Sequence, residues 1–285
     1  MIDAIARACR SGVARSRPVA GGSINEALFV ELEDGRELFV KHRADPPPGF
    51  YAAEAAGLEW LSSVGALPLP AAVAVEETFL ALGWVASAAR AAGFDAALGR
   101  GLARLHAAGA SRHGATGDGG PTFIGPLRLA NDSATSDSWA AFYAERRLAP
   151  LLEMAAGARA LPSGAGRRIE SVIGRLGELC GPEEPVARLH GDLWSGNVMT
   201  GPDGEPVLVD PAAYGGHREI DLAMLSLFGS PGPEFLAAYE DAGPRLADGH
   251  EERVELFQLL PLLVHAVLFG GGYGTAADRA AACYR

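Results

Sequence analysis

The chain has 285 residues, a formal net charge of −11 and an isoelectric point of about 5.1. Its content of 48% hydrophobic and 21% charged residues is typical of a globular protein, and its length allows one large core or two lobes, since domains run to about 100–200 residues. Binding of nucleic acid needs clustered Lys and Arg, so the negative charge argues against nucleic acids and anionic membranes as partners.

Neither the N-terminus nor the apolar stretch near the C-terminus is expected to enter a membrane. Residues 1–12 carry both charge signs and no long apolar run, unlike a secretory signal. Residues 256–272 are interrupted by polar side chains and fall short of the roughly 20 apolar residues of a membrane span. Cys9, Cys180 and Cys283 form neither a metal spacing nor a disulfide framework. We therefore expect a cytoplasmic protein. A monomer is expected, although the sequence does not determine the oligomeric state.

The first third of the chain is predicted to be rich in β-strands. Residues 27–42 alternate apolar and polar side chains on both sides of Asp34-Gly35, a dipeptide that favours a two-residue turn. This pattern predicts a hairpin with Lys41 near the end of its second strand. Residues 68–85 contain short apolar runs bounded by prolines and are expected to form two further strands.

A helix is predicted over residues 51–65. Glu54, Leu58 and Leu61 are spaced i, i+4 and i+7, so they share one face of this helix. Glu59 points about 140° away from Glu54. The spacing therefore sets Glu54 beside the two leucines.

Beyond these strands the pattern becomes helical, and the polar, Gly-rich residues 109–121 are expected to form a mobile loop. The composition changes near residues 83–88. We predict an α+β fold of the two-lobed, protein-kinase-like type, with a small β-rich nucleotide-binding lobe at residues 1–85 and a larger, mainly helical lobe at residues 86–285. Helices of the second lobe are expected at residues 93–109, 137–156, 165–180, 219–228 and 251–270.

Two acids and an amide occur on two neighbouring loops. Residues 190–197 read HGDLWSGN, and residues 198–210 form two short apolar runs about a Gly/Pro/Asp turn. A small hairpin there would bring Asp192, Asn197 and Asp210 together. Divalent cations such as Mg²⁺ take oxygen ligands and are commonly held by one or two carboxylates plus substrate phosphates. An Asp followed five positions later by Asn is also the spacing of the kinase catalytic loop.

These residues predict phosphoryl transfer, in which catalysis is mostly positioning and charge neutralisation. In this interpretation Asp192 accepts the proton of the substrate hydroxyl, while Asn197 and Asp210 hold the metal. Lys41 and Glu54 then supply the ion pair that binds the nucleotide phosphates.

The segment GGSINEA, residues 21–27, precedes the predicted hairpin. Its Gly21, Gly22 and Ser23 would let the backbone approach the phosphates closely, and Asn25 is assigned to the same nucleotide site. The segment does not match G-x-G-x-x-G, so an ordinary loop before a strand is an equal alternative.

HGDLWSGN together with DPAAYGGHREIDLAM, residues 210–224, resembles the signature of the fructosamine kinases, or ketosamine 3-kinases, in the aminoglycoside-phosphotransferase-like branch of the protein-kinase-like fold. The resemblance covers nearly the whole chain. It implies ATP-dependent phosphorylation of the sugar 3-hydroxyl of a ketosamine, an amine glycated by a reducing sugar, as a step of protein deglycation. It also implies magnesium as the metal and the backbone at Gly83, Trp84 and Val85 as the adenine site.

Trp194 and Tyr214 are predicted to present flat apolar faces to the sugar. A core position is the alternative for Trp194, although a Trp inside a polar loop is badly placed for a core. His190 is expected to brace the catalytic loop by hydrogen bonding, and a structural role is expected at least as much as a catalytic one for the polar residues 217–221. Some members of the resembling family carry a redox-sensitive Cys where this chain has Ser23, so no thiol switch is expected there.

Three alternatives remain open from the sequence. The chain could be a kinase of an aminoglycoside, an amino sugar or another small alcohol, a nucleotide-binding regulator without turnover, or a phosphohydrolase. Every predicted catalytic position is occupied, which argues against the regulator, and Lys41 on its hairpin argues for a kinase over a hydrolase. The native sugar and amine are not fixed by the sequence.

Overall fold

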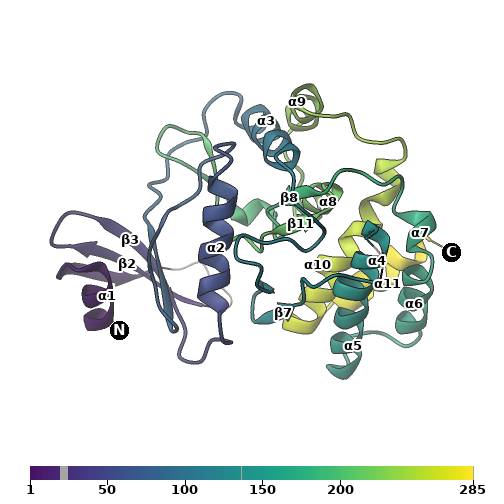
Figure 1. Ribbon diagram of the computed structural model, residues 1–285, viewed down its shortest axis with the longest axis horizontal. Helices are drawn as coiled ribbons and strands as arrows, with labels where there is room; N and C mark the ends of the chain where they lie inside the picture. The colour runs from purple at the N-terminus through teal and green to yellow at the C-terminus, as the bar shows by residue number, and fades with distance from the viewer. Residues whose placement is uncertain (20–24, 136, 285) are drawn as a thin grey trace.

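The computed structural model of the protein describes residues 1–19, 25–135 and 137–284. A five-stranded antiparallel sheet of strand order β1-β2-β3-β5-β4 forms its N-terminal part, and helices form most of the remainder, which confirms the predicted α+β class (Figure 1). The elements of the N-terminal part are α1 (Ile2–Cys9), β1 (Val13–Pro18), β2 (Glu26–Leu32), β3 (Glu37–His42), α2 (Phe50–Ser62), β4 (Ala72–Val75) and β5 (Phe79–Gly83).

Helices α1 and α2 cover opposite faces of this sheet, and α2 lies between the sheet and the helical part (Figure 1). Leu38 and Val40 of β3 pack in the cluster that contains α1, whereas Phe39 packs in the cluster that contains α2. Successive side chains of a strand point to opposite faces. Lys41 is therefore placed on the α2 face of the sheet with Phe39.

The hairpin and the helix predicted for this part are confirmed. Strands β2 and β3 pair antiparallel on both sides of Gly35, whose φ of 86° is readily adopted by glycine in a turn. Strands β4 and β5 are the two further strands that were expected. In α2, Leu58 and Leu61 are fully buried beside Glu54, while Glu59 is exposed.

The helical part is organised around α10, whose Leu259 and Leu263 are buried with side chains of α5, α8 and α11. Pro261 lies inside α10, and the apolar run of the sequence forms most of this largely buried helix, within the helix predicted at residues 251–270. Within the described ranges, the helices are too short or too polar to cross a membrane. The helices of this part are α3 (Phe94–Ala107), α4 (Trp139–Tyr143), the π-helix η1 (Ala144–Leu148), α5 (Ala149–Gly157), α6 (Ala165–Ile173), α7 (Leu176–Leu179), η2 (Ser195–Asn197), α8 (Glu219–Leu227), α9 (Glu234–Ala242), η3 (His250–Arg253), α10 (Val254–Phe269) and α11 (Tyr273–Ala282).

Three short antiparallel ladders complete the fold. The β9-β10 pair is the hairpin predicted between the two acidic loops, and it is flanked by the β8-β11 pair, which the sequence did not predict. Strands of three residues are too short to show a period of two. The ladders are β6 (Thr122–Ile124) with β7 (Leu127–Leu129), β8 (Ala187–Leu189) with β11 (Tyr214–Gly216), and β9 (Val198–Thr200) with β10 (Pro206–Leu208).

The loop predicted at residues 109–121 contains neither helix nor strand. Its backbone is nevertheless anchored, because Gly114 N donates to Gly215 O at 2.8 Å and Gly215 N donates to Ala115 O at 2.7 Å. The Arg112 guanidinium also donates to Asn131 O at 2.6 Å. The first half of this loop is therefore held against β11, while its mobility stays a prediction.

The two parts of the chain pack against each other through α2. A Cβ atom added to Gly57 would lie 3.2 Å from Cβ of Ala213, so the helix approaches the helical part closely at this point. Near the C-terminal end of α2, the Arg188 guanidinium donates to Trp60 O at 2.7 Å and to Ser63 Oγ at 3.0 Å. The division at residue 85 remains a prediction, and these contacts bridge it.

Candidate active site

A cavity of about 840 Å³ lies between the sheet and the helical part. Lys41 and Glu54 line it from β3 and α2, and Asp192, Asn197 and Asp210 line it from the loops around the β9-β10 hairpin. The five residues that the sequence assigned to phosphoryl transfer therefore meet in one cavity, although they come from both parts of the chain.

Lys41 lies between two carboxylates. Its Nζ is 2.5 Å from Glu54 Oε1 and 2.7 Å from Asp210 Oδ1, and its side chain is only 4% exposed. Burial alone would lower the pKa of Lys41, but the charges of Glu54 and Asp210 outweigh burial and raise the pKa above its usual value. Lys41 is therefore a fixed positive charge at neutral pH, at the point where the two acids meet.

Asp192 and Asn197 are held together on the loop between β8 and β9. The Asn197 amide donates to the Asp192 backbone oxygen at 2.8 Å and to Oδ2 of its carboxylate at 3.3 Å. Burial, together with the nearby charge of Asp210, raises the pKa of Asp192 to about 7. A pKa near the working pH suits a group that accepts a proton during turnover.

Asp210 lies two residues after the end of β10 and has a positive φ of 56°. Asp is among the few residues that tolerate this left-handed conformation, and such backbone is concentrated at functional sites. Val209 N donates to Asn197 O at 3.1 Å, which ties the two acidic loops to each other. The oxygens of Asn197 and Asp210 are ligands of the kind that hard divalent cations take.

His190 braces the catalytic loop, as expected. Its Nε2 lies 2.9 Å from Val209 O, and the backbone N–H of Asp192 donates to its Nδ1 at 3.3 Å. Because a carbonyl only accepts, Nε2 carries the proton and Nδ1 is the acceptor. Burial lowers the pKa of His190, which keeps the ring in this neutral form.

Asp221 of α8 holds the same loop from behind, a role that the sequence did not specify. Its carboxylate accepts the backbone N–H of His190 at 2.7 Å and of Gly191 at 2.9 Å, and it lies 3.1 Å from Nε2 of His106. Burial alone would raise the pKa of Asp221, but these hydrogen bonds, first the one from His106, lower it. Asp221 is therefore a buried carboxylate that fixes the backbone next to Asp192.

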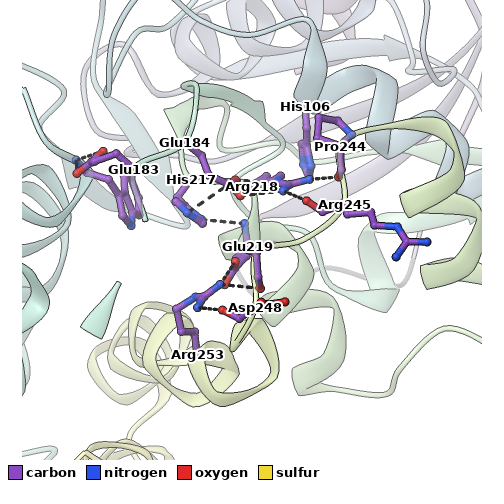
Figure 2. A network of polar contacts seen from close by, with 12 residues as sticks. His106, Glu183, Glu184, His217, Arg218, Glu219, Pro244, Arg245, Asp248 and Arg253 are labelled. Atoms are coloured by element: carbon purple, nitrogen blue, oxygen red, sulfur yellow. Dashed lines mark hydrogen bonds and ion pairs between the residues drawn. The ribbon is translucent and has the colours of Figure 1, made fainter. Parts of the chain in front are cut away.

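An ionic network anchors the start of α8 (Figure 2). The Arg218 guanidinium binds both carboxylate oxygens of Glu184, at 2.7 and 2.8 Å, and Arg253 binds both oxygens of Glu219, at 2.9 and 2.7 Å. Burial lowers the pKa of His217, which lies between these pairs, to about 4. Glu184, His217 and Glu219 lie close enough to hold a metal. Both carboxylates are already bound by guanidinium groups, so the structural role expected for residues 217–221 fits better.

The residues predicted to bind the nucleotide are placed as follows. Asn25 and the consecutive residues Gly83, Trp84 and Val85 line the same cavity as Lys41. Asn25 Oδ1 also accepts the hydroxyl of Tyr51 at 3.4 Å. The predictions for Gly21, Gly22 and Ser23 lie outside the described residues.

Of the two residues predicted to contact the sugar, one lines the cavity and the other does not. Trp194 lines the cavity and is 37% exposed, so the alternative of a core position does not apply. Tyr214 is fully buried in β11, with its ring 4.1 Å from the Arg147 guanidinium, and it is not among the residues lining the cavity. The prediction for Tyr214 is therefore wrong, because its short strand turns the side chain into the hydrophobic core.

Comparisons with known proteins agree with this geometry. The sequence profile of the family described as fructosamine kinase matches residues 3–283. A probable ketoamine kinase from Enterococcus faecium is 33% identical over 265 residues, 92% of each chain.

Solved structures give the same picture. A crystal structure from Thermobifida fusca, assigned as a fructosamine-3-kinase, is 39% identical with a TM-score of 0.90, covering 99% of this chain and 97% of that one. A macrolide 2'-phosphotransferase from Brachybacterium faecium has a TM-score of 0.66 at 18% identity, covering 99% and 96%, and shows the shared protein-kinase-like fold alone.

Proposed function

The chain belongs to the fructosamine kinase family, and we propose that it transfers the γ-phosphoryl group of ATP to the 3-hydroxyl of a ketosamine. The observation that carries this proposal is the meeting of Lys41, Asp192 and Asp210 in one cavity, with Lys41 charged and the pKa of Asp192 raised to about 7. A phosphate-binding cation, a proton acceptor and a metal-binding acid are what phosphoryl transfer to an alcohol requires.

Asp192 is assigned as the general base. As the acceptor oxygen forms its bond to the γ-phosphorus, the hydroxyl proton passes to the Asp192 carboxylate and the bond to the β-phosphate oxygen breaks. The amide of Asn197 donates to Oδ2 of this carboxylate, and the neutral His190 accepts the backbone N–H of Asp192, so both hold the residue in place. The proton therefore leaves the alcohol without needing a free base from solvent.

Asn197 and Asp210 are assigned as magnesium ligands. Their side chains offer one amide and one carboxylate oxygen donor beside the Lys41 ammonium group. Mg²⁺ bound there would neutralise charge on the β- and γ-phosphate oxygens. Lys41, oriented by Glu54, would bind the phosphates directly, and the backbone at residues 83–85 would accept the adenine.

A phosphorylation screen tests this function. Purified protein with ATP is offered ketosamines, free sugars, aminoglycosides and choline, and phosphate transfer is measured for each acceptor. We expect transfer to ketosamines at a rate well above that to the other alcohols. Transfer to another class alone would reassign the acceptor, whereas ATP hydrolysis that ignores the acceptor would indicate a phosphohydrolase. The cytoplasmic location and the monomeric state stay predictions.

A further inference from the structure

Five aromatic side chains line one side of the cavity and touch one another in series. We call Trp194, Phe228, His265, Phe269 and Tyr273 the aromatic rim. Ring centroids are 5.9 Å apart for Trp194 and Phe228, 5.1 Å for Phe228 and His265, 5.5 Å for His265 and Phe269, and 4.9 Å for His265 and Tyr273. The rim therefore starts two residues from Asp192 in the sequence and continues through Phe228, at the C-cap of α8, to α10 and α11.

The rim is open to a ligand. Trp194, Phe228 and Phe269 are 37%, 36% and 48% exposed, which places them among the most exposed large hydrophobic side chains described. Singly exposed apolar side chains are common and need no explanation. Three such rings in one contacting series, on the wall of a cavity that also contains Asp192, indicate a surface that binds part of the acceptor.

The charges in the cavity favour a cationic ligand. Four carboxylates line it, those of Glu54, Asp118, Asp192 and Asp210. Of the described lining residues, Lys41 is the one Lys or Arg, and its charge is already shared between Glu54 and Asp210. Aromatic faces attract cations through their quadrupole. A cavity that is acidic and has an aromatic side is thus matched to an organic ammonium group better than to a neutral one.

His265 adds a hydrogen-bond acceptor to this wall. Its Nδ1 lies 2.7 Å from Pro261 O, so Nδ1 carries the proton and donates it to this carbonyl. Its Nε2 consequently keeps a free lone pair. Burial lowers the pKa of His265, so the ring is neutral and does not repel a cation at neutral pH. His265 also lines a small pocket with Gly191 and Asp192, which places it close to the assigned base.

We propose that the aromatic rim binds the protonated amine of the acceptor and the apolar or aromatic substituent on that amine. This inference rests on the proposed function, because a ketosamine carries its amine on C1, two carbons from the hydroxyl on C3. With that hydroxyl at Asp192, the ammonium N–H reaches Nε2 of His265, and the substituent lies over Phe228, Phe269 and Tyr273. The enzyme therefore selects acceptors by the amine as well as by the sugar.

Acceptor kinetics with Phe269→Leu test the proposal, since Leu keeps apolar bulk but lacks the aromatic face. The acceptors are N-benzyl fructosamine, unsubstituted fructosamine and fructose. We expect kcat/KM for N-benzyl fructosamine to fall by about fivefold or more, fructose to change by less than about twofold, and KM for ATP to stay constant. The matched control is Leu236→Ala, because Leu236 is 39% exposed on α9 and does not line the cavity. Equal losses for all three acceptors would overturn the proposal.

A binding measurement separates this proposal from the proposed function. N-benzyl fructosamine and its neutral ether analogue, 1-O-benzyl fructose, are titrated calorimetrically into wild-type protein and Phe269→Leu in the presence of ADP. We expect the amine to bind wild type at least about fivefold more tightly than the ether. Phe269→Leu should weaken both ligands and keep most of this difference, because both carry the benzyl group that lies over Phe269. Equal binding of amine and ether to wild type would overturn the rim assignment even if ketosamines are phosphorylated. A clear preference for the amine without any phosphate transfer would support the rim and count against the kinase assignment.

Discussion

The two sides of the cavity are held in different ways. On the phosphate side, Lys41 contacts two carboxylates and Asp192 contacts Asn197, so most charged groups are fixed by a polar partner. On the acceptor side, the rings of the aromatic rim contact mainly one another, and several are more than a third exposed. Fixed charges suit a reaction whose geometry is the same for every acceptor. Loosely held rings can be replaced without disturbing that chemistry, so specificity can change on one side alone.

The largest effect is expected from removing the base on the phosphate side. Asp192→Asn keeps the shape of the side chain but cannot accept the hydroxyl proton, so kcat should fall by about 10²–10⁴-fold. Steady-state kinetics with saturating ATP measure the loss, and calorimetric titration of an ATP analogue serves as control because nucleotide binding should persist. A variant with more than a tenth of wild-type turnover would show that another group takes the proton.

Asp210→Asn should come next, because it removes one formal charge from the assigned metal site. Changing a residue that only hydrogen-bonds to a metal ligand typically lowers metal affinity or activity by about 10–100-fold. Changing a ligand itself should therefore lower turnover by more than about 100-fold. The magnesium concentration for half-maximal rate should rise at the same time. Near-normal activity with unchanged magnesium dependence would remove Asp210 from the metal site.

Lys41→Met sharpens the comparison by testing stability as well as activity. Lys41 lies near the end of β3, yet its side chain is buried and contacts both Glu54 and Asp210. Removing one partner of a buried ion pair typically costs about 3–5 kcal/mol. We expect a higher KM for ATP and a lower kcat. The free energy of unfolding, measured with denaturant, should fall by roughly 3 kcal/mol.

The matched control for Lys41→Met is the double variant with Glu54→Gln. The second change removes the unpaired buried carboxylate, so part of the stability should return while activity stays low. Recovery of activity in the double variant would indicate that Lys41 acts only by neutralising Glu54.

Trp194→Ala should produce a smaller effect, confined to the acceptor side. An aromatic side chain buries about 150–250 Å² against its partners. We therefore expect kcat/KM for the sugar substrate to fall by an amount that corresponds to about 2–3 kcal/mol of lost transition-state binding. ATP affinity and melting temperature should change little, because Trp194 is 37% exposed. Equal losses for both substrates with a marked drop in melting temperature would instead assign Trp194 to the fold.

The smallest effect concerns stability and pH. The pKa of Asp192 is raised to about 7 in the folded protein, whereas an unfolded Asp titrates near 3.9. The folded state therefore holds this proton more tightly, and its stabilising effect is present below about pH 4 and is lost as pH rises to 7. Without nucleotide and metal, Asp192→Asn should be more stable than wild type at pH 8 by about 1–2 kcal/mol, and less so at pH 5. Thermal unfolding at both pH values measures this, and a constant difference would contradict the raised pKa.

The sequence predicted the parts of the site that depend on local pattern. The hairpin carrying Lys41, the helix carrying Glu54 and the β9-β10 pair all have short-range signals in alternation, spacing or turn residues. These signals were sufficient to bring Asp192 and Asp210 together.

The remaining features depend on long-range packing. The burial of Tyr214 follows from the pairing of β11 with β8, three-residue strands that are 25 positions apart in the sequence. Asp221 reaches the amides of His190 and Gly191 only because α8 lies behind the loop. The aromatic rim likewise joins Trp194 with the C-cap of α8 and with α10 and α11, so it depends on packing between distant segments.

The packing of α2 also bears on regulation. Protein kinases that are switched on and off commonly move the helix that carries the Glu partner of the nucleotide-binding Lys. Here that helix is fixed at Gly57 by close approach to Ala213, and near its end by the Arg188 hydrogen bonds to Trp60 and Ser63. Swinging α2 outward would break these contacts together. We therefore expect the Lys41–Glu54 pair to stay formed between turnovers, unlike the corresponding pair in kinases that are switched by moving this helix.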